Sequence, residues 1–247
     1  MWSSGRGRWW TSVRLRTSLL AVALTTMVNG HCRAEGWMLT LLDGEAVVID
    51  GARRLTAGPG LRVSPGALVE TSATTALVRF EGPDQATIDL GPDTRAMLAP
   101  DNATARGGRP PAVYLQQGSV KLTSQEGSTF PGLVAPGLEL LPFSGSAVVQ
   151  VGKGDRAVFA EAARLDVGER HSGGVPRFLK AGEFYSGDGK RAGIVAERPT
   201  ADWLKQVPRA FRDPLPLRAA ALRDKPFEAP PLPGPTYEQL ARWLGAE

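Results

Sequence analysis

Short apolar runs, interrupted at regular intervals by glycine, proline and aspartate, dominate the chain between Gly44 and Leu122. Apolar and polar residues alternate, or nearly so, within most of these runs. A period of two is typical of a β-strand with one buried face. The pattern therefore predicts strands at Glu45–Ile49, Gly60–Val63, Ala67–Glu70, Ala76–Phe80, Ala86–Leu90, Ala96–Leu98 and Val113–Leu122.

Turn-forming residues separate these runs, for example Gly58-Pro59-Gly60 and Ser64-Pro65-Gly66. Glycine accepts positive φ, proline fixes φ, and aspartate bonds to its own backbone, so each residue type favours a turn. Strands at such short spacing predict a mainly β fold, either a β-sandwich, a barrel or a β-helix-like module. Because the apolar positions are mostly aliphatic, we expect a thin core between two β-layers.

The β-region continues beyond the first 123 residues. Further strands are predicted at Leu133–Leu141, Gly145–Val151, Arg156–Glu161, Ala163–Val167 and Phe178–Phe184. We therefore expect one β-domain over residues 37–195.

Residues 196–247 form a proline-rich tail, since nine of the 20 prolines fall between Pro199 and Pro235. This density prevents long helices and central strands. Two short amphipathic helices are nevertheless predicted. The first begins after the N-cap Thr200 and runs to Phe211. The second follows the capping box Thr236-Tyr237-Glu238-Gln239 and runs to Leu244.

Four aromatic residues of the tail are the binding candidates that the sequence offers: Trp203, Phe211, Tyr237 and Trp243. One interpretation is that they cap the open end of the β-domain. The other is that they anchor the tail to a partner, because aromatic side chains contribute strongly to binding.

The N-terminal 34 residues have the layout of a secretory signal peptide. Four arginines up to Arg16 precede an uncharged run from Thr17 to Val28, and Cys32-Arg33-Ala34 offers a small-x-small cleavage site. We expect cleavage after Ala34 and a periplasmic or secreted protein. The alternative is a leader kept as a membrane anchor, although the apolar run is shorter than the roughly 20 residues of a comfortable span.

Removal of the leader changes the charge of the chain. Residues 1–34 contain five arginines and no acid, so 24 basic and 25 acidic residues remain. These are scattered along the chain, whereas a nucleic-acid-binding domain carries a basic stripe. Nucleic acid is therefore not an expected partner. Cys32 is the single cysteine and leaves with the leader, so no disulfide is expected.

The order of the segments is similar to a known family. The segments are Gly44 to Val48, Leu55 with Gly58, Leu61 to Thr71, Leu77 to Phe80, Ala86 to Arg95, and Leu115 to Val120. Together they resemble the FecR domain, with its G-x-V strand, G-D-x-V-x-T segment, D-G-s-x-v-x-l-x-p-n-S segment and L-x-x-G strand. The resemblance is best over residues 37–123. Gly66-Ala67 replaces the usual Gly-Asp, which exchanges one turn former for another.

The resemblance implies a β-rich extracytoplasmic module. In the namesake regulators this module is the periplasmic part of an iron-signalling protein and contacts an outer-membrane transporter. Those regulators also carry a cytoplasmic segment that handles a sigma factor. Here 16 residues precede the apolar run, so we do not expect sigma-factor regulation to carry over.

Residues suited to catalysis or metal binding are scarce. His171 is the single histidine after the leader, so a site with two or three imidazoles cannot form, and neither a metal nor a cofactor is expected. Paired acids occur as Asp84 with Asp89 and Glu161 with Asp166. They leave open a hydrolase of the cell envelope, which would need two carboxylates facing each other across a groove.

The sequence thus predicts a non-enzymatic, exported binding or scaffold module of the bacterial cell envelope. Its expected partner is an envelope protein or a cell-wall polymer, contacted through a strand edge or the tail. Contact with a membrane is expected only if the leader is retained.

Overall fold

The computed structural model describes residues 36–99, 110–169, 176–188 and 192–244. By its contacts the chain divides into residues 1–32 and 33–247, and all described residues belong to the second unit. The predicted leader and His171 therefore lie outside the described residues.

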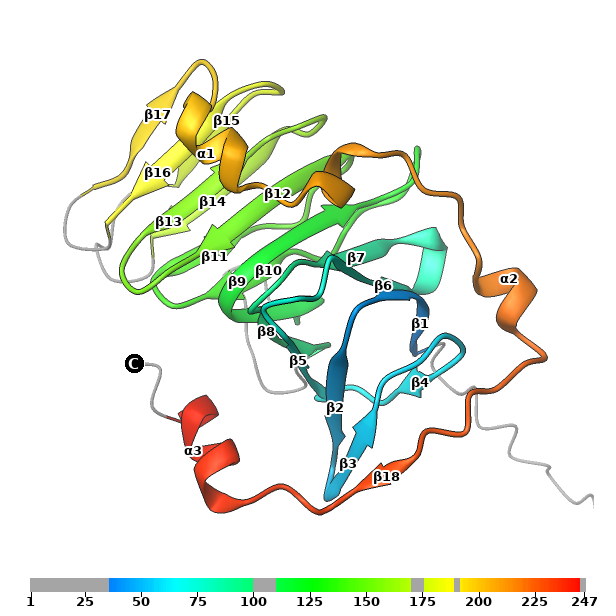
Figure 1. Ribbon diagram of the computed structural model, residues 1–247. Helices are drawn as coiled ribbons and strands as arrows, with labels where there is room; N and C mark the ends of the chain where they lie inside the picture. Colours follow the sequence, from blue (N-terminus) through cyan, green and yellow to red (C-terminus); the bar gives the residue numbers. More distant parts are fainter. Residues whose placement is uncertain (1–35, 100–109, 170–175, 189–191, 245–247) are drawn as a thin grey trace, which may run out of the picture. The chain divides into compact units, whose positions relative to one another are not determined.

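The fold is mainly β, as the sequence predicts, and its α-helices occur near the C-terminus (Figure 1).

The strands form two layers, which we call sheet A and sheet B. Sheet A is antiparallel throughout. In spatial order it contains β4 (Arg62–Val63), β1 (Trp37–Asp43), β6 (Leu77–Glu81), β7 (Thr87–Leu90), β9 (Val113–Thr123), β12 (Ser146–Val151), β13 (Arg156–Phe159), β16 (Phe184–Gly187) and β17 (Ile194–Ala196).

Sheet B has one parallel contact, between β9 and β10, and is otherwise antiparallel. In spatial order it contains β18 (Pro231–Leu232), β3 (Arg53–Thr56), β2 (Ala46–Asp50), β5 (Leu68–Thr71), β8 (Arg95–Leu98), β9, β10 (Leu133–Ala135), β11 (Leu138–Leu140), β14 (Leu165–Glu169) and β15 (Arg177–Leu179).

Strand β9 belongs to both sheets. Its first part pairs with β8 and β10, and its second part pairs with β7 and β12. The change of neighbours falls at Gly118, which has a φ of +96°. A Cβ atom there would lie 2.3 Å from Thr94 Oγ1, which accepts a hydrogen bond from the Ser119 amide at 3.0 Å. Glycine is therefore needed where the strand passes from one sheet to the other.

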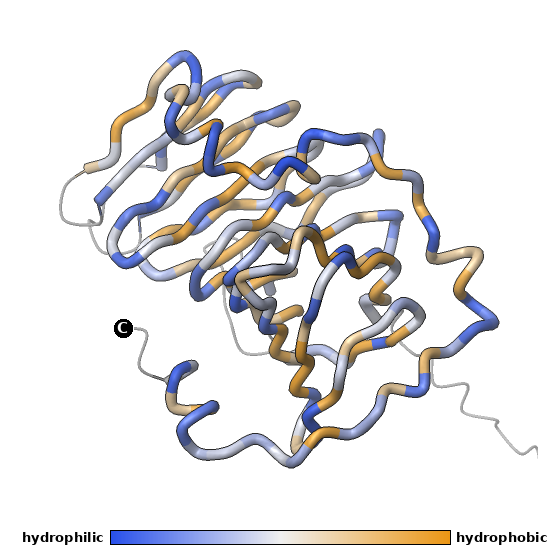
Figure 2. The backbone as a smooth tube through the Cα atoms, viewed as in Figure 1, coloured by the Kyte–Doolittle hydropathy of each residue, from blue (hydrophilic) through white to orange (hydrophobic). Residues whose placement is uncertain are grey.

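The core lies between the two sheets. Hydrophobic and hydrophilic residues alternate along many strands, which gives each sheet one apolar face (Figure 2). The core is largely aliphatic, as predicted, and its fully buried members include Leu39, Ile88, Leu90, Leu115, Leu122, Leu133 and Leu140. An aromatic group joins it where Phe130 stacks on Phe143 at 5.5 Å between ring centroids.

The predicted strands agree with the structure, mostly with ends that differ by a residue or two, but two predicted runs divide and four strands were not predicted. The predicted strand Phe178–Phe184 is two strands, β15 and β16, because Gly182 turns the chain with a φ of +90°. The run Leu133–Leu141 likewise divides into β10 and β11 at Gly137, which has a φ of +70°. The pattern did not predict β1, β17 or β18, nor β3, whose one buried residue is Leu55.

The C-terminal segment, residues 197–244, wraps around the two sheets, and we call it the belt (Figure 1). It crosses sheet A, passes β1, pairs with β3 through β18, and ends beside β5 and β9. Its helical elements are α1 (Ala201–Gln206), the 3₁₀ turn η2 (Arg209–Arg212), α2 (Ala219–Leu222) and α3 (Tyr237–Leu244). No helix among the described residues has the length and hydropathy needed to cross a membrane.

The helix predicted from Thr200 to Phe211 begins as expected but ends early. Thr200 Oγ1 accepts the Trp203 amide at 3.2 Å, which confirms the N-cap. The helix stops at Gln206 because Pro208 has no amide hydrogen and forces Val207 into an extended conformation, with a ψ of 127°. Phe211 lies in the following 3₁₀ turn.

Candidate functional site

A row of side chains crosses the outer face of sheet A, on the side away from the core. The pairing registers align one residue from each strand, and these residues are Arg79, Asp89, Lys121, Val148, Phe159 and Phe184. The row is charged over β6, β7 and β9 and apolar over β12, β13 and β16. The outer face therefore has a polar half and an apolar half.

The polar half is built on a buried ion pair. Arg79 Nε donates to Asp89 Oδ1 at 2.6 Å and Arg79 Nη2 donates to Asp89 Oδ2 at 2.7 Å, so the contact is bidentate. The two side chains are 8% and 1% exposed. Burial is the strongest influence on the pKa of Asp89 and raises it, while the hydrogen bonds and charge of Arg79 act in the opposite direction.

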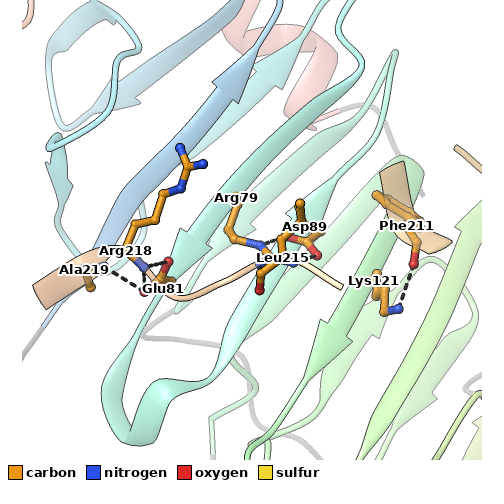
Figure 3. A network of polar contacts seen from close by, with 8 residues as sticks. All are labelled: Arg79, Glu81, Asp89, Lys121, Phe211, Leu215, Arg218 and Ala219. Atoms are coloured by element: carbon orange, nitrogen blue, oxygen red, sulfur yellow. Dashed lines mark hydrogen bonds and ion pairs between the residues drawn. The ribbon is translucent and has the colours of Figure 1, made fainter. Parts of the chain in front are cut away.

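The belt lies on this polar half and is held through main-chain atoms (Figure 3). Arg79 Nη1 donates to the Leu215 carbonyl at 3.0 Å, and Lys121 Nζ donates to the Phe211 carbonyl at 2.7 Å. Glu81 accepts hydrogen bonds from the amides of Arg218 and Ala219, at 2.8 and 2.9 Å. Side chains of β6 and β9 thus bind the backbone of the belt.

The apolar half receives the side chains of α1 and η2. Trp203 lies 4.9 Å from Phe184 and 5.9 Å from Phe159, measured between ring centroids. Val207 and Phe211 are buried in the same cluster, with Leu77, Val148 and Ala157 beneath them. The Trp203 indole N–H is buried without a hydrogen-bond partner.

A groove of about 590 Å³ runs beside α1 on the same face. Gln150, Ala157 and Ser186 line it, with Thr200, Trp203 and Gln206 from α1 and its N-cap. Ile194 of β17 also lines it and is 71% exposed. β17 pairs with β16, and no described strand pairs with its other side. The groove thus adjoins an open sheet edge.

The structure separates the four predicted aromatic binding residues. Trp203 and Phe211 are buried against sheet A, whereas Tyr237 is 82% exposed. Trp243 is half-buried and donates to Glu70 Oε1 at 3.2 Å. Two hydrogen bonds form the predicted capping box, between the Thr236 amide and Gln239 Oε1 and between the Gln239 amide and Thr236 Oγ1. A binding role for these aromatic residues remains a prediction.

The two predicted carboxylate pairs differ in environment. Asp84 is exposed on the 3₁₀ turn η1 (Pro83–Gln85), whereas Asp89 is buried and bound to Arg79. Glu161 is bound by Lys121 and Ser146, and Asp166 is exposed on β14. Neither pair lines the groove. Among the described residues, no group of three or more histidine, cysteine, aspartate or glutamate side chains could hold a metal.

Sequence reasoning missed both the ion pair and the open edge. Arg79 and Asp89 occupy polar positions of two consecutive predicted strands, and Gly82-Pro83-Asp84 lies between those strands. A hairpin there would place opposite charges side by side, so the signal for the pair was present. The open edge of β17 depends on the order of the strands, which no local pattern specifies.

No family model matches the chain, and no curated protein matches it. Among solved structures, two crystal structures of a "putative anti-sigma factor" from Parabacteroides distasonis ATCC 8503 are similar to it. Their identities are 12% and 14% and their TM-scores 0.42 and 0.41; each match covers 53% of this chain and 59% of the other. At these TM-scores the similarity supports no argument about this chain.

Proposed function

We propose that this chain is an exported, non-enzymatic FecR-like binding or scaffold module of the bacterial cell envelope. Its partner is an extended segment of an envelope protein, which adds to sheet A at the edge of β17. The observation that carries the proposal is the open β17 edge with the groove beside it.

The edge of β17 has the properties of a strand-addition site. An edge strand presents unpaired N–H and C=O groups, and proteins usually protect such edges with charged residues, proline or a bulge. β17 consists of Ile194, Val195 and Ala196, none of which is charged or proline, and all three are exposed. An added strand would satisfy these groups and cover Ile194.

The lining of the groove favours a polypeptide over a glycan. Sugar rings usually stack on exposed aromatic faces, but Trp203 and Phe184 are 7% and 4% exposed. The polar lining residues of the groove, Gln150, Ser186 and Gln206 with the charged Asp155, Arg156 and Asp188, can bond to the amides, carbonyls and side chains of a peptide. We therefore favour an envelope protein over a cell-wall polymer.

Two features of the sequence support export, and two ion pairs in the structure support the absence of catalysis. The basic and apolar leader has the layout of a signal peptide, and the resemblance to the FecR domain implies an extracytoplasmic module. Of the predicted carboxylates, Asp89 and Glu161 are engaged in ion pairs, which leaves them unsuited to act as a free acid and base.

The test is site-specific crosslinking in the bacterial cell. A photo-crosslinking amino acid replaces Ile194 in one full-length chain and Tyr237 in another. We expect position 194 to crosslink one envelope protein. That protein, purified, should then bind the wild-type chain and lose at least tenfold in affinity for Ile194→Lys, because lysine protects an open edge.

Ile194→Val is the matched control and should bind as the wild type does. Crosslinking from position 237 alone would favour the tail as the binding element, and sedimentation with purified cell wall that Ile194→Lys weakens would favour a polymer. Hydrolysis of peptidoglycan that disappears in a single carboxylate variant would overturn the non-enzymatic assignment.

A further inference from the structure

We infer that the outer face of sheet A is a second protein-docking surface, occupied here by residues 200–219 of the belt, which we call the strap. A partner's extended segment that is basic and carries aromatic residues would replace the strap on this face. The surface adjoins the groove beside β17 and shares Phe184 and Trp203 with it, but the inference holds whether or not the β17 edge binds a protein.

The face recognises main-chain atoms of the strap. Arg79 and Lys121 donate to carbonyl oxygens, and Glu81 accepts from two successive amides. Every peptide carries such atoms, so these contacts do not require the strap's own sequence. Arg79 also remains fully bonded to Asp89 when the strap is absent, because only its Nη1 bond is lost. The polar half of the binding surface thus keeps its arrangement before any segment binds to it.

Specificity resides in the apolar half of the face. Only Trp203, Val207 and Phe211 of the strap are buried, and the two aromatic residues are eight positions apart. Buried aromatic anchors dominate the binding energy of many interfaces. A competing segment therefore needs aromatic residues at a similar separation, joined by a chain that can follow the row of side chains.

Charge favours a basic occupant. The strap has four basic and two acidic residues. The face beneath it carries two cations, Arg79 and Lys121, and three carboxylates, Glu81, Asp89 and Glu161. A basic segment on a face with an excess of carboxylates is electrostatically complementary, which steers association and disfavours acidic competitors.

The strap can leave without opening the core. Its buried residues belong to a cluster on the outer face, separate from the core cluster between the sheets. Beyond Phe211 it is mostly exposed, with Leu217 39% exposed and no residue of α2 buried. Such a segment can detach without unfolding of the whole domain. Departure exposes Leu77, Val148 and Phe184, so the vacated face favours another apolar occupant.

The test measures binding of a fluorescent synthetic peptide of residues 200–219 to the purified chain by anisotropy. We expect the peptide to bind the Phe211→Ala and Trp203→Ala chains at least tenfold more tightly than the wild type, because the resident strap competes less well. Two control peptides, one with the same composition in scrambled order and one that carries Phe211→Ala, should bind these variant chains at least tenfold more weakly than the native peptide does. The chain with Leu217→Ala is the matched control and should bind the native peptide as the wild-type chain does, since Leu217 is exposed.

Circular dichroism establishes that each variant retains its β-structure, and the two independent strap variants guard against one that does not fold. Folded Phe211→Ala and Trp203→Ala chains that bind the peptide no more tightly than the wild type would overturn the inference. Equal binding of the ordered and scrambled peptides would do the same. Neither result bears on crosslinking from position 194, so the two proposals fail independently.

Discussion

At the scale of single residues, the Arg79–Asp89 pair dominates the outer face of sheet A. Two buried charges are tolerated because each satisfies the other in a bidentate geometry. Such a pair contributes modestly to stability while it is intact, but its partial removal leaves a charge without compensation in a medium of low polarity.

We expect Asp89→Ala to lower the free energy of unfolding by about 3–5 kcal/mol, because it leaves the Arg79 guanidinium buried without its partner. The measurement is urea denaturation followed by circular dichroism. Asp166→Ala is the control, since Asp166 is exposed, and should change stability by less than about 0.5 kcal/mol. Equal effects of the two substitutions would contradict the importance of the pair.

Tyr185 gives a prediction about alkaline pH. Burial and the hydrogen bond from its hydroxyl to Glu169 raise its pKa from 10.0 to about 12. Between these values the unfolded chain loses the proton and the folded chain keeps it. The contribution to stability is therefore complete below pH 10 and is lost as the pH rises to about 12.

The measurement is a titration of tyrosinate absorbance, together with denaturation at several alkaline pH values. Tyr185 should titrate late in the wild type, and this late component should be absent from Tyr185→Phe. A late component that persists in Tyr185→Phe would show that another tyrosine is responsible.

The sequence could predict which residues point outward but not what covers them. Alternation places Arg79 and Asp89 opposite the apolar face of their strands. That both are buried follows from the belt, which arrives from more than 120 positions later in the chain. Local patterns carry no information about such distant contacts.

At the scale of elements, strand β9 requires a glycine where it changes sheets. We expect Gly118→Ala to destabilise the protein by about 2–5 kcal/mol, from the cost of positive φ and from the clash with Thr94. Gly127→Ala is the matched control, because Gly127 has a φ of +80° and no atom lies within 4 Å of the place that a Cβ would take. It should cost about 1–2 kcal/mol.

Thermal and urea unfolding measure both variants. Similar losses at the two positions would mean that backbone conformation alone, and not the close approach of Thr94, explains the requirement for glycine at Gly118.

Helix α1 is attached to sheet A through Trp203. Replacement of Trp203 by phenylalanine and by alanine should lower the free energy of unfolding by different amounts. Trp203→Phe keeps an aromatic ring against Phe159 and Phe184 and removes an N–H that has no partner, so we expect a loss below about 1.5 kcal/mol. Trp203→Ala removes the ring and should cost about 3–5 kcal/mol. Urea denaturation separates the two, and equal losses would contradict the packing role of the ring.

Strand positions were largely predictable, whereas strand order was not. Alternation located β6, β7 and β9 to within a residue or two because apolar and polar residues alternate along each. It could not distinguish β15 from β16, since Phe178 to Phe184 reads as one run. The pairing of β9 with β12, and the edge position of β17, depend on packing between distant segments.

At the scale of the whole described unit, the belt holds the two sheets together from outside. Phe227 packs over Gly58, where a Cβ atom would lie 2.3 Å from its ring. The sequence identified this glycine as part of a turn, and the structure shows that it also leaves space for the belt. The need for that space could not be predicted, because it depends on a residue far along the chain.

Limited proteolysis should reveal the difference in stability between the belt and the sheets. We expect trypsin to cut after Arg223, which is exposed between the contact of the belt with Glu81 and its pairing through β18, before it cuts within the paired strands. Mass spectrometry of early fragments is the measurement. A first cut within β6, β9 or β12 would contradict this order.

Because β9 belongs to both sheets, the chain cannot be divided after this strand without loss of strand pairs. Strand β9 ends at Thr123, yet two of its partners, β10 and β12, come later in the chain. A gene truncated at that point would encode a protein with a long unsatisfied strand. Only the side that faces β7 and β8 would remain paired, so such a fragment would present a long open edge to other polypeptides.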